Sequence, residues 1–436
     1  MVHCSRGTGV RVHRPRDRPL HFEGDNLSSS VVVVSFQPTK WLGRCLDSVV
    51  GQADEVILVD NGSEGGSVAA YGRRGVQVLR LAENEGFASG VNAGVATAHG
   101  DVVALLNDDA VACPSWLETS ERALEDCDVA AVAPRILLAS PFGEVALDDE
   151  EHFAPGDARA LGRRLTSATI DGKDVLSALI GPGVHRLEQA PDGERWRWTA
   201  GRRCFYVPLP GKPDLGDQSQ GGLSQACGDA LELVLNGEPV PVRRVVDLVN
   251  SAGSYLRADG YAGDCGAELP DDDRWRLPRE CFAVSGTALV TTAAVLSRVG
   301  PFERSYFAYY EDTDWCWRAR LQGYRIMYEP ASTVRHVRGQ TSGGTLAART
   351  RFLAERNRIL TLLRCAPLPL ALREARRKWL GGGDDGVAGV LPRAFPAALA
   401  QRAQLRRRRA LRSQEVYRRW AGVDVPSENA GPTTTS

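Results

Sequence analysis

Residues 31–36 read VVVVSF, and residues 55–63 read EVILVDNGS. Both stretches contain a short apolar run, and the second ends in a polar turn. Continuous apolar runs of this length predict strands that are buried on both faces of a parallel sheet. Apolar residues at helical spacing lie between the two runs, so the pattern predicts a strand–helix–strand unit with a right-handed crossover.

Strand and helix patterns continue to alternate along the chain. Further strands are predicted at 76–81, 102–106, 129–133, 281–291, 324–328 and 332–338, and helices at 86–98, 312–322 and 346–363. We therefore predict an α/β fold with a mainly parallel central sheet flanked by helices. In such sheets, ligands bind at the carboxyl ends of the strands.

Two segments depart from this pattern. Residues from about 141 to 245 are dense in Gly and Pro, with short alternating pieces, which predicts a β-rich insertion. After Pro367 the composition shifts to Ala, Leu and Arg, which predicts a helical segment. We divide the chain into a disordered N-terminal tail (1–27), an α/β domain (28–365) containing the insertion, and an Arg-rich helical segment with a polar tail (366–436).

Composition and charge narrow the class of protein. The 436 residues carry 53 basic and 54 acidic side chains, a formal net charge of -1, so no nucleic-acid partner is expected. The ten cysteines form no CxxC pair, which is typical of free thiols in a reducing compartment. Because no apolar run reaches the roughly 18 residues of a spanning helix, a cytoplasmic location is expected.

The neutral average hides a basic segment near the C-terminus. Gln401–Trp420 holds eight Arg and one Glu, together with an imperfect apolar stripe. Such a charge run has two interpretations that the sequence leaves open. It is either a solvated helix face or a surface that docks on anionic lipid at the inner face of the membrane.

Polar side chains follow two of the predicted strands. Asn107, Asp108 and Asp109 come directly after one strand, and adjacent carboxylates there favour a site for Mg²⁺ or Mn²⁺. Asp60 ends another strand, where its carboxylate can accept a hydrogen bond from a nucleobase. Both stretches can equally be simple turns, in which Asn and Asp are common.

Residues 84–94 read NEGFASGVNAG and combine a predicted helix start with three glycines. Glycines at a helix start let its N-terminus approach a phosphate. Tight packing of the helix on the sheet explains the glycines nearly as well. The spacing is not GxGxxG, so a dinucleotide-binding fingerprint is not supported.

Acidic and aromatic residues mark the start of the helix predicted at 312–322. Glu311, Asp312 and Asp314 lie within four residues of each other, among aromatic side chains that can stack on a sugar. Acids in a first turn complement the helix dipole. The same positive helix end also keeps a carboxylate ionised, as a general base requires.

His336 is the only His after His185 and lies on a strand-like run. A lone His on a strand is more often structural than a metal ligand. Its pattern by itself therefore predicts no metal site.

In this order, the stretches resemble family 2 inverting glycosyltransferases with a GT-A fold. The similarity is greatest to the rhamnosyltransferase and galactofuranosyltransferase-like branch, which builds bacterial surface polysaccharides. The motifs that carry it are VVVVSF at 31–36, LVDNGS at 58–63, ENEGFASGVNAG at 83–94, LLNDDA at 105–110, VSGTALV at 284–290, GPFERSYFAYYEDTDWCWRARLQGYRIMYEPASTVRHVRGQTSG at 300–343 and ERNRI at 355–359. The insertion and the basic segment are not covered.

The resemblance implies donor-binding roles for four of these residues. Asp60 would contact the uracil or thymine base of the donor, with Asn61 beside it. Asn84 and Gly86 would line the same pocket.

The resemblance also implies a metal site at the diphosphate. Asn107 to Asp109 corresponds to the DxD element, with Asp109 as a ligand of Mn²⁺ or Mg²⁺ and with Asn107 and Asp108 on the donor side. Asn107 departs from the pattern, although its amide oxygen can still bind a cation. His336 would complete the metal site, as in the galactofuranosyltransferase-like members.

On the acceptor side, the resemblance assigns Asp312 as the catalytic base. Further candidates on this side are Ser285, Gly286, Tyr310, Glu311 and Trp315.

The implied activity is metal-dependent, inverting transfer of a sugar from a nucleoside-diphosphate donor of the dTDP-rhamnose or UDP-hexose type. The acceptor would be a hydroxyl of a cell-surface or cell-wall glycan or of a polyprenyl-linked glycolipid. Two alternatives stay open. A non-catalytic carbohydrate-binding homologue is supported only by Asn107, and a nucleotidyltransferase would need a Gly-rich basic loop that residues 35–40 do not form.

Overall fold

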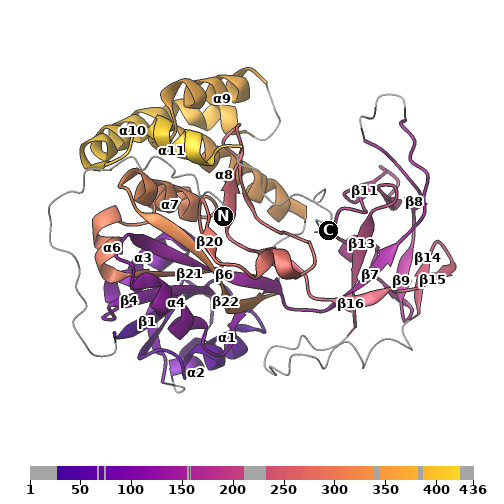
Figure 1. The fold of residues 1–436 in the computed structure, drawn as a ribbon, viewed down its shortest axis with the longest axis horizontal. Coiled ribbons are helices and arrows are strands. Elements are labelled where there is room, and N and C mark those ends of the chain that lie inside the picture. The colour runs from indigo at the N-terminus through magenta and orange to yellow at the C-terminus, as the bar shows by residue number, and fades with distance from the viewer. Residues whose placement is uncertain are drawn as a thin grey trace, which may run out of the picture.

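The computed structural model describes residues 27–65, 68–72, 75–154, 157, 159–210, 232–337, 344–381 and 386–422. The predicted disordered tail, up to residue 26, and the polar tail from residue 423 lie outside the described residues. Figure 1 shows a central sheet between helices, a smaller β-rich part beside it, and a layer of C-terminal helices.

The central sheet has ten strands. They are β1 Ser29–Ser35, β2 Glu55–Asp60, β3 Gln77–Arg80, β4 Val102–Asn107, β5 Ala110–Ala112, β6 Val129–Leu138, β17 Val249–Ser251, β20 Arg279–Glu280, β21 Ala288–Thr292 and β22 Arg325–His336. The order is β20-β22-β6-β21-β4-β1-β2-β3, with β17 beside β6 and β5 beside β22. Strands β1 to β4 run parallel, as do β6 and β22, whereas β21 runs antiparallel to β4 and β6. The predicted fold class is confirmed.

Helices cover both faces of this sheet. They are α1 Leu42–Val49, α2 Ala69–Gly72, α3 Phe87–Thr97, α4 Trp116–Leu124, α6 Ala293–Val299 and α7 Glu311–Leu321. Val32 and Val34 of β1 pack into the core that includes α3, α6 and α7, while Val31 and Val33 pack into the core that includes α1 and α4. Burial on both faces explains why β1 is a continuous apolar run.

Two glycines of α3 serve close packing on the sheet. A Cβ atom on Gly94 would lie 2.3 Å from Cγ1 of Val32, and one on Gly90 would lie 2.7 Å from Cγ1 of Val34. Neither position has room for a side chain, so α3 can approach β1 closely. Of the two explanations for the glycines, packing therefore accounts for Gly90 and Gly94.

Two strand predictions need correction. The strands predicted at 324–328 and 332–338 form the single strand β22, because a register shift between Glu329 and Thr333 accommodates the intervening proline. The strand predicted at 281–291 joins the sheet as β21 only from Ala288.

The backbone before β21 bonds to α7 instead of to a strand at two points. Val284 N donates to Cys316 Sγ (3.4 Å), and Gly286 N donates to a carboxylate oxygen of Asp312 (2.7 Å). These contacts hold the segment against the helix, away from the sheet.

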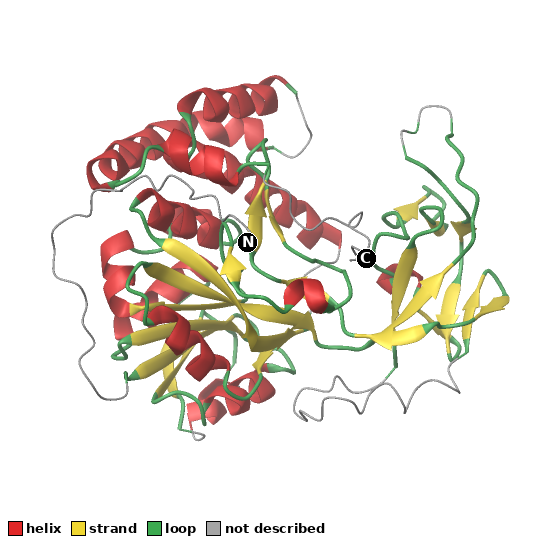
Figure 2. Ribbon diagram, in the orientation of Figure 1, coloured by secondary structure: helices red, strands yellow, loops and turns green. Residues whose placement is uncertain are grey.

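The chain leaves the sheet after β6 and returns to it at β17, which pairs with β6. Between them, short strands form three small sheets with antiparallel pairing around their own apolar core (Figure 2). The strands are β7 Phe142–Ala146, β8 Arg164–Leu165, β9 Ala168–Ile170, β10 Lys173–Asp174, β11 Glu188–Gln189, β12 Arg195–Trp198, β13 Cys204–Pro208, β14 Leu233–Leu235, β15 Glu238–Val240 and β16 Arg244–Val246. A further hairpin follows, formed by β18 Ser254–Leu256 and β19 Ala262–Asp264.

The C-terminal helices pack on the α/β part. They are α8 Gly344–Cys365, α9 Leu368–Leu380, α10 Val387–Arg408 and α11 Ser413–Trp420. Between α10 and α11 the amides of Ala410 and Leu411 donate to the carbonyl oxygen of Leu321 at the end of α7. Within the described chain, no helix is both long and apolar enough to cross a membrane.

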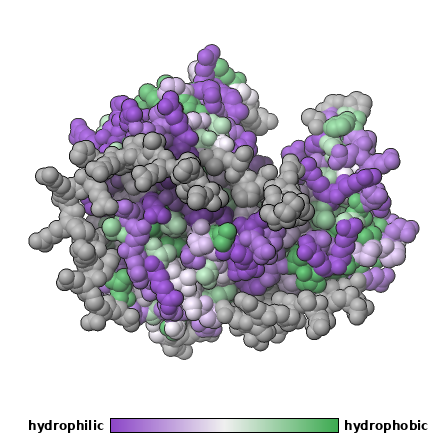
Figure 3. Space-filling model, viewed as in Figure 1, coloured by the Kyte–Doolittle hydropathy of each residue, from purple (hydrophilic) through white to green (hydrophobic). Residues whose placement is uncertain are grey.

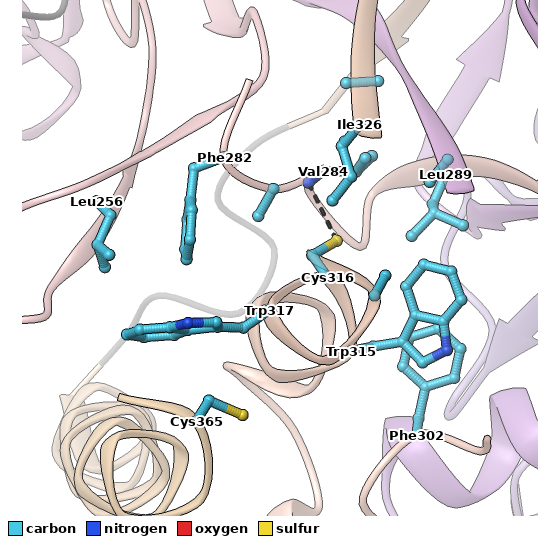
Figure 4. Close-up of a cluster of buried hydrophobic side chains, with 14 of the residues drawn as sticks. Leu256, Phe282, Val284, Leu289, Phe302, Trp315, Cys316, Trp317, Ile326 and Cys365 are labelled. Atoms are coloured by element: carbon cyan, nitrogen blue, oxygen red, sulfur yellow. Dashed lines mark hydrogen bonds between the residues drawn. The ribbon is translucent and has the colours of Figure 1, made fainter. Parts of the chain in front are cut away.

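Helix α7 is enclosed by its neighbours (Figure 4). Trp317 meets Phe282 edge-on at 5.2 Å between ring centroids, and Trp315 stacks on Phe302 at 5.7 Å. From α11, Trp420 lies 3.9 Å from the guanidinium carbon of Arg320.

Buried ion pairs compensate the charges that α7 carries into this core. Asp314 is fully buried and lies 2.8 Å from Arg318 on its own helix and 2.9 Å from Arg364 on α8. Arg364 also lies 3.2 Å from Glu303. The pairs join α7 to α8.

We expect Asp314→Asn to lower the free energy of unfolding by about 3–5 kcal/mol, because the buried Arg318 loses its counter-charge and the buried Arg364 keeps only Glu303. Urea denaturation measures the change. Glu118→Gln, which breaks an exposed pair with Arg122, is the control and should change stability by no more than about 0.5 kcal/mol. Equal effects of the two substitutions would contradict this account.

Candidate active site

The candidate active site lies where β1, β2 and β4 end at one edge of the sheet. Strand pairing places Ser35 beside Asp60 and Val34 beside Asn107. Ser35 Oγ donates to Asp108 Oδ2 at 2.6 Å. The polar motifs after β2 and β4 are thus neighbours through β1, as expected for the carboxyl ends of parallel strands.

Asp60 is buried at the end of β2. Its Oδ1 accepts a hydrogen bond from Ser63 N (2.8 Å), and its Oδ2 lies 3.7 Å from Nε of Arg80. These contacts hold the Asp60 carboxylate, a hydrogen-bond acceptor, at the carboxyl end of β2.

Asn61 ties this strand end to the segment before α3. Its Nδ2 donates to Asn84 Oδ1 (3.2 Å) and to the carbonyl oxygen of Gly86 (3.1 Å), while its Oδ1 accepts from Glu85 N (3.1 Å). Asn84 Oδ1 also accepts from Gly86 N (3.0 Å). The four predicted donor-side residues therefore occupy one connected part of the structure.

Gly86 also allows a close approach to the segment that leads into α7. Its φ is +88°, and a Cβ atom there would lie 2.5 Å from the carbonyl oxygen of Phe307. Any side chain would meet backbone at this point. The glycine therefore lets the donor-side loop contact the chain just before Asp312.

The segment before α7 is strained. Phe307, Tyr309 and Tyr310 have φ values of 67°, 71° and 69°, which side chains rarely adopt. Asn357 of α8 is fully buried, and its Nδ2 lies 2.7–3.0 Å from the carbonyl oxygens of Tyr306, Ala308 and Tyr309. Strain held in this way is typical of functional sites.

Asp312 is the second residue of α7, and three donors bind its carboxylate. Its Oδ2 accepts from Gly286 N (2.7 Å), and its Oδ1 accepts from the amide and the hydroxyl of Thr313. Burial raises the pKa of Asp312, and these hydrogen bonds oppose the increase because they favour the ionised carboxylate.

Glu311 lies beside Asp312 but lacks comparable donors. Burial, followed by the charge of Asp312, raises the pKa of Glu311 well above its usual value. Its Oε2 is buried without a hydrogen-bond partner among the described residues. Hydrogen bonds therefore favour the anion of Asp312, whereas no comparable set of donors favours the anion of Glu311 among the described residues.

A backbone contact connects Asp312 with the end of β4. Asn107 N donates to the carbonyl oxygen of Thr287 (2.9 Å), and Thr287 directly follows Gly286. A hydrogen bond from Gly286 to Asp312, the peptide bond from Gly286 to Thr287, and the hydrogen bond from Asn107 to Thr287 therefore join the base candidate to the Asn107–Asp109 motif.

Asp109 and His336 meet at the other side of this motif. Nε2 of His336 lies 3.2 Å from Oδ1 of Asp109, and Nδ1 lies 2.6 Å from Oδ1 of Asn250. The contact of Nδ1 with Asn250 and that of Nε2 with Asp109 together fix the orientation of the His336 ring.

Asn250 is a residue that the sequence reasoning missed. It lies on β17, 86 positions before His336. β17 and β22 both pair with β6, which brings the two residues together. Nothing in the sequence around Asn250 marks it, because its role depends on this strand order.

The Asp109–His336 pair fits part of a divalent metal site. Adjacent ligands at about 2.1 Å from an octahedral ion are about 3 Å apart, close to the observed separation. Burial, with the charge of Asp109, raises the pKa of Asp108 to about 6, and a cation would relieve this crowding of carboxylates. Among the described residues, no three His, Cys, Asp or Glu side chains cluster as ligands, so the remaining ligands would come from elsewhere.

Four of the five acceptor-side candidates lie at Asp312 or contact the segments beside it. Gly286 and Glu311 adjoin Asp312, Ser285 bonds Thr287 Oγ1 (3.3 Å), and the hydroxyl of Tyr310 accepts from Ala262 N (3.2 Å).

The prediction for Trp315 is wrong. Its ring is completely buried on Phe302, and Nε1 donates to the carbonyl oxygen of Gly300 (3.0 Å). It lies on the inner side of α7, so it is a core residue and cannot stack on an acceptor sugar.

Residues 30–160 match the model of the family described as Glycosyl transferase family 2. The matched range includes β1 to β4 with Asp60, Asn84 and the Asn107–Asp109 motif. The predicted resemblance to this family is confirmed over these residues. The rhamnosyltransferase and galactofuranosyltransferase-like branch stays a prediction.

Known glycosyltransferases are similar to parts of the chain. Glycosyltransferase AglE of Haloferax volcanii is 25% identical over 179 residues, and the match covers 37% of this chain and 58% of AglE. The chain thus spans less than two thirds of this relative.

Two solved structures have 13% sequence identity to this chain. The structure of GalNAc-T7 with UDP, GalNAc and Mn²⁺ has a TM-score of 0.47 and covers 87% of this chain and 57% of its own. That of the mannosyltransferase PcManGT from Pyrobaculum calidifontis with GDP-Man and Mn²⁺ has a TM-score of 0.40, with 91% and 88% coverage.

We expect Asn250→Ala to weaken Mn²⁺ binding about 10- to 100-fold, because His336 loses the acceptor that fixes its ring. Isothermal titration calorimetry with Mn²⁺ and a nucleoside diphosphate measures the change. Asn236→Ala, in the β14–β15 turn, is the matched control and should bind Mn²⁺ like the wild type. Unchanged affinity of Asn250→Ala would show that Asn250 does not position His336 for a metal.

Proposed function

We propose that the protein is a metal-dependent, inverting glycosyltransferase. It would transfer a sugar from a nucleoside-diphosphate donor of the dTDP-rhamnose or UDP-hexose type to an acceptor hydroxyl. The observation that carries the proposal is the pair of carboxyl groups at the start of α7, in which Asp312 beside Glu311 accepts hydrogen bonds from Gly286 N and from Thr313. The contact between Asn107 and Thr287 joins this pair to the Asp109–His336 site.

On the donor side, Asp60 would accept a hydrogen bond from the N–H of a uracil or thymine base. Ser63 N already donates to Oδ1 of Asp60, whereas Oδ2 meets only Nε of Arg80 at 3.7 Å among the described residues and would accept the hydrogen bond of the base. Asn61, Asn84 and Gly86 would shape the pocket around the nucleoside.

Asp312 would act as the general base. It takes the proton of the acceptor hydroxyl, the acceptor oxygen bonds to the anomeric carbon, and the bond from that carbon to the diphosphate oxygen breaks. A single displacement of this kind inverts the anomeric centre and needs no enzyme nucleophile. A protonated Glu311 avoids a second negative charge beside Asp312, which keeps Asp312 available as the base.

Asp109 and His336, with Asn107 and Asp108 nearby, are the residues that would hold Mn²⁺ or Mg²⁺. When bound, the cation would neutralise charge on the departing diphosphate. Asn250 would orient His336 for this task.

The acceptor that we assign is a cell-surface or cell-wall glycan or a polyprenyl-linked glycolipid, reached from the cytoplasmic side of the membrane. Support comes from the family branch that the sequence resembles and from the Arg-rich C-terminal helices. A peripheral location on the inner face of the membrane belongs to the same proposal.

We expect Asp312→Asn to lower kcat about 10²- to 10⁴-fold, because the acceptor hydroxyl loses its base. A donor panel (dTDP-rhamnose, UDP-galactofuranose, UDP-glucose, UDP-galactose and GDP-mannose) with Mn²⁺ or Mg²⁺ provides the assay. Glu311→Gln is the matched control and should retain most of the rate, since a protonated Glu311 is already neutral.

Normal transfer by Asp312→Asn would refute the base assignment. Absence of nucleoside diphosphate release by the folded wild type with every donor would instead favour the non-catalytic carbohydrate-binding alternative.

We expect Thr313→Val to move the acidic limb of the pH–kcat profile to higher pH. The Thr313 hydroxyl stabilises the Asp312 anion, so its removal raises the pKa of Asp312 and protonates the base over a wider acidic range. Rates at saturating donor across a pH series test this. A limb that stays in place or moves to lower pH would contradict the prediction.

A further inference from the structure

Helix α9 exposes an unusual number of large apolar side chains. Leu368, Leu372, Trp379 and Leu380 account for four of the ten large hydrophobic residues that are exposed in the described chain, and Trp379 and Leu380 are each 63% exposed. Exposed Trp and Leu on one short helix mark an interaction site rather than a random surface.

The orientation of α9 is set by its buried face. Leu370, Ala371, Glu374 and Ala375 are buried on the side toward the protein. The intervals of four and seven residues from Leu368 to Leu372 and Trp379 place these three in one line on the outer side. The apolar stripe is therefore held outward by the packing of the opposite side.

Basic residues border the stripe. Arg373, Arg376 and Arg377 are exposed on the same outer side, and Arg373 and Arg377 each pair with the buried Glu374 (3.1 and 2.9 Å). Residues 366–422 contain 13 of the 53 basic but only 4 of the 54 acidic side chains of the chain. The helical layer is thus strongly positive while the rest of the protein is acidic. In Figure 3 the upper layer has hydrophobic groups among hydrophilic ones.

The Arg-rich segment 401–420, in contrast, turns its apolar residues inward. Val416 is buried, and Leu405, Leu411, Tyr417 and Trp420 pack against the main core. This segment can offer charge to a partner but little apolar surface.

We propose that the outer face of α9, formed by Leu368, Leu372, Trp379 and Leu380 with Arg373, Arg376 and Arg377, docks the protein on an anionic lipid bilayer. The inference rests on the proposed function, because a polyprenyl-linked acceptor would lie at such a surface. Apolar side chains enter the acyl boundary while guanidinium groups meet lipid phosphates. A second copy of the chain is a poorer occupant, since it would bring the same positive charges face to face.

Co-sedimentation of the full-length protein with vesicles tests the proposal. The wild type should bind vesicles of phosphatidylglycerol and phosphatidylcholine, bind phosphatidylcholine vesicles far less, and lose affinity as salt is raised. The double variant Leu372→Ser/Trp379→Ser should lower partitioning by about tenfold or more. Phe153→Ser, which removes a side chain 69% exposed on the β-rich part, is the matched control and should bind like the wild type.

A second comparison separates α9 from the Arg-rich segment. Arg406→Gln/Arg407→Gln/Arg408→Gln should weaken binding less than the α9 double variant does, and only at low salt. Wild-type binding by the α9 variant, or no binding by the wild type, overturns the proposal. A change of oligomeric state in the α9 variant without a change in vesicle binding assigns the face to a second copy and also overturns it.

Donor hydrolysis without vesicles distinguishes this proposal from the proposed function. The α9 double variant should release nucleoside diphosphate at the wild-type rate, because none of its substitutions lies at the candidate active site. Vesicle binding by a protein with no donor turnover would refute the transferase activity while supporting the docking face.

Discussion

The enclosure of α7 is the constraint on which the rest of the site depends. The helix carries four buried charged side chains and the partly buried Asp312, and each must be paired, hydrogen-bonded or neutralised. Asp314 meets Arg318 and Arg364, and Arg320 donates to the carbonyl oxygens of Cys281 and Phe282. Only the first turn holds carboxyl groups without a cationic partner among the described residues. The same burial that anchors the helix therefore gives Glu311 and Asp312 their raised pKa values.

The segment before α7 couples this helix to the donor side. Three residues with positive φ form a turn that Asn357 stabilises from α8, and Gly86 approaches its backbone from the other side. Backbone strain costs free energy, which the hydrogen bonds of one buried amide offset. Asp312 is in this way positioned by helices α3, α7 and α8 together.

The strand order positions the candidate metal site in a similar way, because β17 and β22 both pair with β6. The chain departs from the sheet after β6 and returns beside the same strand as β17, so about a hundred residues can be inserted without separating β6 from β22. Loop closure costs little more for a long segment than for a short one. The return strand brings Asn250 to His336, which links the inserted part to the candidate metal site.

Local patterns in the sequence determined the alternation of strands and helices, because apolar periodicity reflects which faces are buried. The resemblance carried by the motifs singled out Asp60, Asp109, Asp312 and His336, which the structure brings to one edge of the sheet. Only the tertiary structure decided the positions of Asn250 and Asn357, the burial of Trp315 and the outward face of α9. Each of these depends on which element packs against which, a choice set by contacts between residues far apart in the chain and invisible to any local pattern.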